Sequence, residues 1–186
     1  NQWINTLAEK HPVIAWGIGF NHHYDAPPIK TTLNLKKLAL VGLRDFDKEY
    51  PYLPCVSCLK KELEATTLIK REIGCITHYE NTKQHFDWPT MYNDAPFQDL
   101  IRFIAESRVI VTNTYHMVYW ATLMGKKVVL YKPFSNKFDA LQFKPVPYSG
   151  DITADIKKAN VYPAALAECR QRNIAFFEKV KHIIET

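Results

Sequence analysis

Five short apolar runs constrain the fold of this chain more than any other feature of its sequence. They lack the strict polar–apolar alternation of a half-exposed strand, and each is too short to form a typical helix. Runs of this kind are typical of parallel strands that helices cover on both faces. They occupy residues 12–19, 38–43, 73–79, 109–112 and 128–131.

Helical stretches lie between and after these runs. Apolar residues recur at helical spacing over residues 97–107, and Pro96 suits the first turn of that helix. Residues 115–124 predict a second helix, which Gly125 closes as its C-terminal cap. An amphipathic helix is expected over residues 163–184. The alternation predicts a Rossmann-like, doubly wound α/β fold with a mostly parallel sheet, a long C-terminal helix and a ligand crevice at the carboxyl ends of the strands.

Size and charge favour one soluble Rossmann-like domain over residues 1–186. Of the 186 residues, 47% are hydrophobic and 23% are charged, which is a globular profile. The net charge of +5 is modest and spread along the chain, so it fits a small anionic ligand better than a nucleic acid. No apolar run is long enough to span a membrane, so we expect a cytoplasmic protein, at most peripheral to the inner membrane. Irregular loops are expected over residues 21–32 and 134–151.

The stretch from residue 108 to residue 138 contains the strongest functional signal. A buried strand and a polar turn lead into a helix whose first turn holds His116. The N-terminus of a helix favours anions, and a His there can act as acid or base near neutral pH. The alternative is a His that only packs or caps. After the next strand, Ser135, Asn136 and Lys137 face the same crevice, where Lys137 could neutralise a phosphate or a carboxylate.

Two sets of residues carry a resemblance to a known family. The first set comprises residues 109–112, His116, Ala121, Gly125, residues 128–131 and Lys137. The second set comprises Gly42-Leu43-Arg44-Asp45 and Pro54-Cys55-Val56-Ser57-Cys58, which look like elements of uncharacterised proteins from bacterial capsule and exopolysaccharide loci. Over roughly residues 12–140, the chain resembles the C-terminal half of the polysaccharide pyruvyl transferase family, whose fold is like that of the two-domain GT-B glycosyltransferases.

The resemblance implies transfer of a pyruvyl or glycosyl group from an anionic activated donor to a saccharide acceptor during surface-polysaccharide synthesis. It implies that His116 is the acid/base or donor-phosphate residue and that Lys137 contacts the donor anion. Many pyruvyl transferases have an Arg two residues before this His, where the chain has Thr114. An Arg would bind the carboxylate of phosphoenolpyruvate in a bidentate manner, so a nucleotide-sugar donor stays open. No cofactor is expected.

Further candidate residues follow the first two strands and begin the central helix. Gly17 and Gly19 allow close approach of the backbone to a ligand, but the full dinucleotide fingerprint is absent, which excludes a standard NAD site. The candidates for donor binding are Gly17, Gly19, Thr114, Tyr115, Ser135, Asn136 and Lys137, and those for the acceptor or the crevice are His22, His23, Arg44 and Asp45.

Two alternatives remain open. Cys55, Cys58, Cys75 and His78 have spacings that suit zinc, which would make the chain a small zinc-stapled domain. Residues three apart in a strand point to opposite faces, which disfavours joint coordination by the last two and favours reduced thiols without a metal. The second alternative is a non-catalytic or degenerate GT-B-like half that acts as a docking module, with a missing N-terminal domain or a second copy as its partner.

Overall fold

The computed structural model describes residues 2–27, 33–46, 49–80 and 86–185. They divide into two compact units, which we describe separately. Unit 1 comprises Asn1–Ser57, Ser135–Gln142 and Ala167–Thr186, and unit 2 comprises Cys58–Phe134 and Phe143–Leu166. The expected single domain over residues 1–186, alone or as half of a two-domain protein, stays a prediction.

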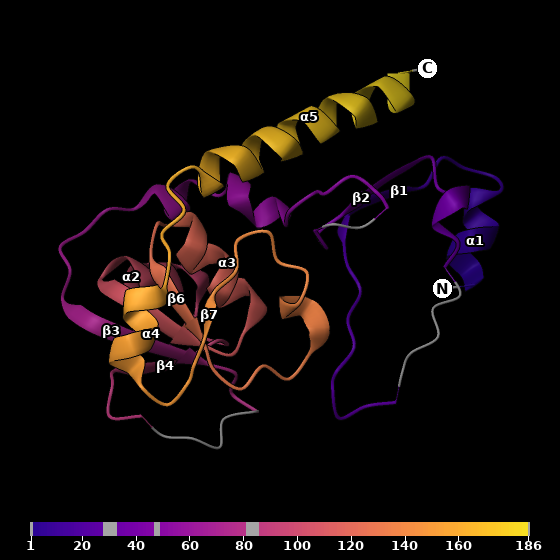
Figure 1. Ribbon diagram of the computed structural model, residues 1–186. Helices are drawn as coiled ribbons and strands as arrows, with labels where there is room; N and C mark the ends of the chain where they lie inside the picture. Colours follow the sequence, from indigo (N-terminus) through magenta and orange to yellow (C-terminus); the bar gives the residue numbers. More distant parts are fainter. Residues whose placement is uncertain (1, 28–32, 47–48, 81–85, 186) are drawn as a thin grey trace. The chain divides into compact units, whose positions relative to one another are not determined.

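Unit 2 contains a five-stranded sheet in which all neighbouring strands run parallel (Figure 1). The strand order is β4-β3-β5-β6-β7. The strands are β3 (Arg71–Thr77), β4 (Thr90–Tyr92), β5 (Ser107–Thr112), β6 (Lys127–Leu130) and β7 (Val146–Pro147). Because β4 lies on one side of β3 and β5 on the other, the direction of winding reverses between β3 and β5, where α/β sheets commonly bind ligands.

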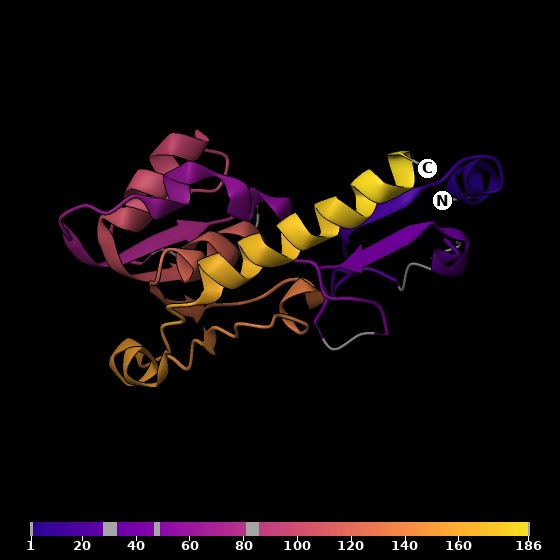
Figure 2. The same cartoon turned by 90° about the horizontal axis from the view of Figure 1, so that it is seen from above.

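Helices flank this sheet on both faces. They are α2 (Phe97–Ala105), α3 (Tyr115–Leu123) and α4 (Ile152–Lys158). Ile152 and Ile156 of α4 pack against a buried cluster that includes Val111 and Val129. Figure 2 shows the sheet between α2 and α4. The predicted α/β fold with a mostly parallel sheet is therefore confirmed.

Turn residues explain the helix boundaries in unit 2. Gly125 has a φ of +67°, a conformation that suits glycine, and it follows α3 as predicted. Pro96 has an extended backbone and precedes α2 as its N-cap, whereas the sequence placed it inside the first turn. A proline has no N–H group to lose at either position, so both are compatible with its ring.

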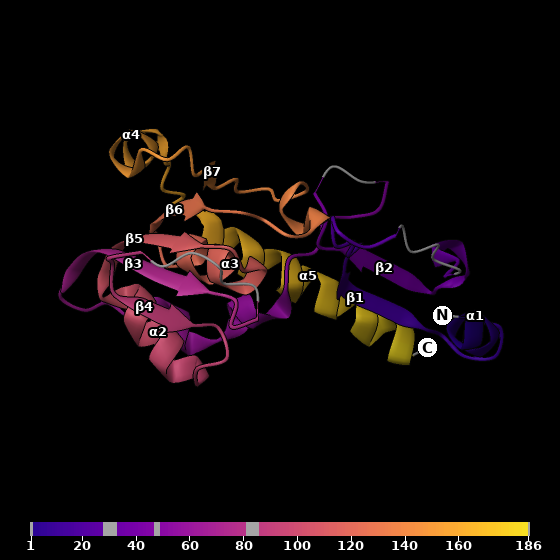
Figure 3. The ribbon, with the colours of Figure 1, turned by 90° about the horizontal axis from the view of Figure 1, so that it is seen from below.

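Unit 1 contains a two-stranded parallel sheet covered by the long C-terminal helix. Its elements are α1 (Gln2–Ala8), β1 (Ile14–Ile18), β2 (Leu40–Leu43) and most of α5 (Ala165–Glu185). Phe176 and Val180 of α5 pack with Ile14, Trp16 and Leu40 of the strands. Figure 3 shows α5 running along β1 and β2. The predicted long C-terminal helix is thus confirmed.

The second face of this small sheet packs against the segments beside β2. Ala15, Val41 and Leu43 form the buried cluster there, with Leu35, Leu38 and Tyr50 packed against it. The 3₁₀ helices in the two units are η1 (Leu35–Lys37), η2 (Val56–Leu59), η3 (Lys61–Glu64) and η4 (Asn136–Phe138). Of the expected loop over 21–32, residues 28–32 lie outside the described residues.

None of the helices in the described part of the chain has the length and hydrophobicity that crossing a membrane requires.

Candidate functional site

In unit 1, the loop after β1 is hydrogen-bonded to residues that lie 114 positions further along the chain. The N–H of His22 donates to Asn136 Oδ1 over 2.8 Å, and the N–H of Asn136 donates to the carbonyl of His22 over 3.0 Å. The loop after β2 reaches the same segment, because Phe46 donates its N–H to the carbonyl of Ala140 over 2.8 Å. The polar residues predicted after β6 therefore meet the carboxyl ends of β1 and β2.

This arrangement brings two cations together. Arg44 directly follows β2, and Lys137 lies in η4. Burial lowers the pKa of Lys137 below its ordinary value, and the positive charge of Arg44 lowers it further. The site therefore favours a negatively charged ligand, which would offset both effects.

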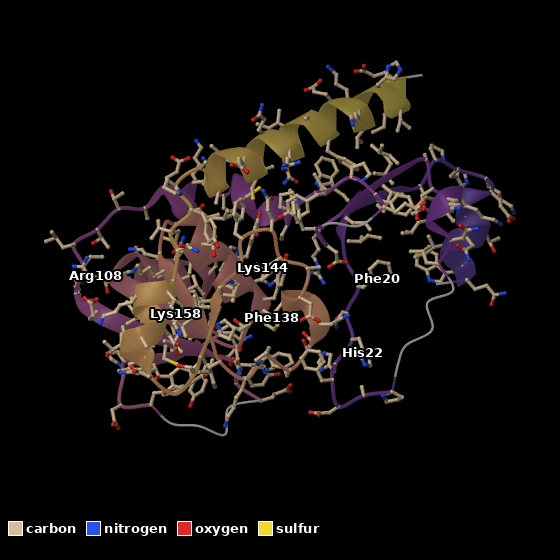
Figure 4. All side chains as sticks on the ribbon, viewed as in Figure 1. Phe20, His22, Arg108, Phe138, Lys144 and Lys158 are labelled. Carbon is tan, nitrogen blue, oxygen red and sulfur yellow. The ribbon has the colours of Figure 1, made fainter. Side chains whose placement is uncertain are left out.

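Two polar side-chain atoms in the same segments are buried and have no hydrogen-bond partner among the described residues. They are Ser135 Oγ, in a residue that is only 1% exposed, and His22 Nδ1. Buried polar atoms are nearly always paired, so unpaired ones suggest that a ligand completes them. We call Arg44, Lys137, Ser135 and His22 the unit 1 cluster. Figure 4 shows His22 on the loop after β1 and Phe138 on the segment to which that loop is bonded.

Asp45 stands beside the cluster but has a structural contact. Its side chain is buried, and Oδ2 accepts a hydrogen bond of 2.7 Å from the N–H of Phe20. The carboxylate thus fixes the loop after β1. Further along this loop, the hydroxyl of Tyr24 donates a hydrogen bond of 3.1 Å to Asp139 Oδ1. Burial raises the pKa of Tyr24, and the bond to Asp139 raises it further.

The two glycines at the end of β1 each have a structural role: Gly17 has a positive φ, and Gly19 leaves space for the side chain of Arg44. Gly17 has a φ of +60°, and a Cβ there would lie 3.4 Å from the carbonyl oxygens of Leu53 and Pro54. A Cβ at Gly19 would overlap the side chain of Arg44. His23 is exposed, and its backbone forms an isolated antiparallel β-bridge with that of Ser135.

The predicted acid/base residue belongs to unit 2. His116 is the second residue of α3 and is exposed, with ring centroids 5.6 Å from Tyr115 and 5.4 Å from Trp120. Thr114 is the N-cap, and its N–H donates to Thr112 Oγ1 over 3.1 Å. Tyr115 is buried. Thr114 and Tyr115 therefore shape the start of the helix, whereas His116 is accessible.

The reversal point between β3 and β5 brings together residues that the sequence did not predict for donor or acceptor binding, although His78 was a candidate zinc ligand. The N–H of His78 donates to Asn113 Oδ1 over 2.8 Å. The His78 ring lies 5.2 Å from the ring of Tyr79 and 5.3 Å from that of Phe134, centroid to centroid. Thr77 Oγ1 is buried without a hydrogen-bond partner in the described structure. The position of these residues at the carboxyl ends of adjacent strands is the signal that could have found them.

The cysteines do not form a metal centre in the described part of the chain. No group of three or more His, Cys, Asp or Glu side chains there could hold a metal ion, so Cys55, Cys58, Cys75 and His78 are not gathered for zinc. None of the four cysteines is paired with another in a disulfide. Burial raises the pKa of Cys75 to about 12, which makes this thiol unreactive.

A shallow, mainly apolar groove of about 270 Å³ lies elsewhere in unit 2. Its walls include Glu62 of η3 with Ile101 and Ala105 of α2. It contains none of the predicted site residues, so we assign it no role in binding a charged ligand.

Comparison of the chain with models of protein families, with curated proteins and with solved structures finds no match.

Proposed function

We propose that this chain is a transferase of bacterial surface-polysaccharide synthesis. It would move a pyruvyl or glycosyl group from phosphoenolpyruvate or a nucleotide sugar to a saccharide acceptor, in the cytoplasm. The observation that carries this proposal is the meeting of Arg44 and Lys137 at the carboxyl ends of β1 and β2. The sequence resemblance supplies the reaction class.

The electrostatics favour a donor with an anionic leaving group. An anion that binds beside Lys137 would offset both the burial of its ammonium group and the positive charge of Arg44. Charge-assisted hydrogen bonds from Arg44 and Lys137 would hold that anion more strongly than neutral donors could. They would also stabilise the negative charge that develops on the leaving group during transfer.

Both transfers release a phosphate-containing anion. In glycosyl transfer, the acceptor hydroxyl gives its proton to a base, its oxygen bonds to the anomeric carbon, and the bond from that carbon to the nucleoside diphosphate breaks. In pyruvyl transfer, two acceptor oxygens bond to C2 of phosphoenolpyruvate, the C2–C3 double bond becomes a single bond, and the bond from C2 to the phosphate oxygen breaks. One hydroxyl proton goes to C3, and the other leaves with inorganic phosphate. The sequence resemblance implies that His116 is the base, and its imidazole is exposed in the first turn of α3 in unit 2.

A specific observation also favours the docking-module alternative. Among the described residues, the unit 1 sheet has only two strands, β1 and β2. Sheets in globular proteins most often have about four to six strands, so a two-stranded sheet has room for further strands beside it. Strands from another domain or from a second copy would complete it, and the protein would then bind without catalysing.

A turnover assay separates these two candidates. The purified chain is incubated with phosphoenolpyruvate or a sugar nucleotide and with capsular oligosaccharides, and the release of inorganic phosphate or nucleoside diphosphate is measured. We expect acceptor-dependent release that His116→Ala lowers by roughly 10²-fold or more, with circular dichroism unchanged. The control is His11→Ala, which alters an exposed His near the N-terminus. Unchanged release in His116→Ala would rule out the proposed base, and absence of release with every donor would favour the docking module.

A further inference from the structure

We propose that the unit 1 cluster binds the phosphoryl end of the donor and discriminates against a carboxylate. This inference rests on the proposed function, because it names the chemical group that the same site recognises. The cluster would bind the phosphate group of phosphoenolpyruvate and not its carboxylate. The phosphates of a nucleotide sugar would bind in the same position.

The first argument is the pair of buried, unpaired atoms. Ser135 is almost fully buried, yet its hydroxyl meets no partner among the described residues. The Nδ1 atom of His22 is also buried and has no hydrogen-bond partner among the described residues, and it lies on the loop that is hydrogen-bonded to Asn136. A hydroxyl and an imidazole nitrogen can both donate to an oxygen acceptor. A ligand with several acceptor oxygens would satisfy both.

The second argument is charge. Arg44 and Lys137 contribute two positive charges within one small region. A phosphate monoester carries close to two negative charges near neutral pH, which matches two cations better than the single charge of a carboxylate.

The third argument is the number of donors. A guanidinium, an ammonium, a hydroxyl and an imidazole together offer more hydrogen-bond donors than the two oxygens of a carboxylate need, whereas a tetrahedral phosphoryl group with three free oxygens could use them. The two oxygens of a carboxylate lie in one plane and suit a bidentate Arg alone. The cluster in unit 1 therefore supplies phosphoryl binding, and no carboxylate site is assigned to it.

The experiment is calorimetric titration of the full chain at constant ionic strength, with thermal melting as a second readout. The ligands are methyl phosphate, which stands in for a monoester donor, pyrophosphate, which stands in for a nucleotide donor, and pyruvate. We expect one of the two phosphate compounds to bind at least tenfold more tightly than pyruvate and to raise the melting temperature. The tighter of the two identifies the source of the phosphoryl group.

The variants test the assignment of residues. Lys137→Gln and Ser135→Ala should each weaken phosphate binding, the former by roughly tenfold or more because a charged hydrogen bond is lost. Lys144→Gln, which alters an exposed Lys in unit 2, is the matched control and should bind like the parent. If Lys137→Gln fails to fold, Arg44→Gln takes its place. Equal binding of pyruvate and phosphate, or unchanged binding in the folded variants, would overturn the inference.

The outcomes for the two proposals are distinguishable. Phosphate binding that Lys137→Gln abolishes, in a chain without turnover, would support the phosphoryl site and contradict the transferase. Turnover that is normal in Lys137→Gln and Ser135→Ala would support the transferase and contradict the phosphoryl site.

Discussion

The charged and polar side chains of unit 2 and those of the unit 1 cluster have different surroundings. In unit 2, Glu106 is bonded to Lys70 over 2.6 Å and to Arg71 over 2.9 Å, and Asn113 is bonded to His78. In unit 1, the positive charge of Arg44 acts on a second cation, and Ser135 Oγ is buried without a partner among the described residues. Thr77 Oγ1 is an exception in unit 2. Paired groups are typical of a structural framework, whereas unpaired groups and like charges are typical of a binding site.

The largest expected effect is on the core of unit 2. Ile110 is fully buried in β5, and truncation to Ala removes buried methyl groups and leaves a cavity. Ile110→Ala should lower the free energy of unfolding by roughly 2–5 kcal/mol. The measurement is denaturant unfolding followed by circular dichroism. The control is Ile174→Ala on α5, a residue 56% exposed, which should change that free energy by no more than about 0.5 kcal/mol. Equal losses would show that the sheet of unit 2 is not the stable framework.

The next effect concerns the helix of unit 1. Asn173 is buried and accepts from Trp16 Nε1 over 2.8 Å, and it donates to the carbonyl of Pro54 over 3.1 Å. Asn173→Ala leaves both partners unsatisfied, so we expect a loss of roughly 1–3 kcal/mol in the free energy of unfolding. Gln171→Ala, an exposed change on the same helix, is the control for thermal melting. If both variants melt at the parent temperature, Asn173 does not hold α5 on β1.

The contribution of Glu106 to the stability of unit 2 should depend on pH in the acid range. The hydrogen bond from Lys70 is the largest cause that holds the pKa of Glu106 below its ordinary value of 4.5. A carboxyl group with a lowered pKa in the folded state stabilises the protein above its unfolded pKa, and this contribution is lost as the pH falls through the folded pKa. Glu106→Gln should therefore be less stable than the parent near neutral pH, and the difference should shrink below pH 4.5.

The matched control is Glu72→Gln, because Glu72 pairs with Arg108 on the exposed surface. Its pH profile should follow that of the parent, since exposed pairs contribute little. A Glu106→Gln variant with the parent's stability at every pH would show that the ion pairs of unit 2 are not structural.

The smallest expected effect is the change in stability that removing the charge of Lys137 in the unit 1 cluster would cause. The pKa of Lys137 is lowered from 10.5 in the folded chain, so the unfolded chain binds more protons between the lowered value and 10.5. Stability should rise with pH in that alkaline window, and Lys137→Met should remove this rise. Near neutral pH without anions, we expect the variant to be as stable as the parent or slightly more stable. Lys144→Met is the control. A marked loss of stability in Lys137→Met would mean that this Lys is structural.

The sequence predicted the framework better than the small elements. The apolar runs located β1, β2, β3, β5 and β6, and helical spacing located α2, α3 and α5. Two strands gave no such signal: β4 has three half-exposed or exposed residues, and β7 consists of Val146 and Pro147. That β1 and β2 pair in a sheet of their own could not be foreseen, because strand pairing depends on contacts between distant segments.

The same limit applied to the site. Arg44 and Lys137 could be predicted at strand ends, but not that one would lower the pKa of the other. The contact of Asp45 with the N–H of Phe20 is also a tertiary feature. The exposure of His116 was a further finding of the structure, because it shares with Trp120 the one face of α3 that lacks buried residues, and an apolar Trp there gives no sequence signal for an exposed face.

The most direct test of the contrast between the units is a crystal structure of the chain with methyl phosphate or pyrophosphate. We predict density for the phosphoryl group within about 3.2 Å of Lys137 Nζ and Ser135 Oγ, the range of a hydrogen bond. Density beside His78 and Asn113 of unit 2, with no ligand at the unit 1 cluster, would contradict the account.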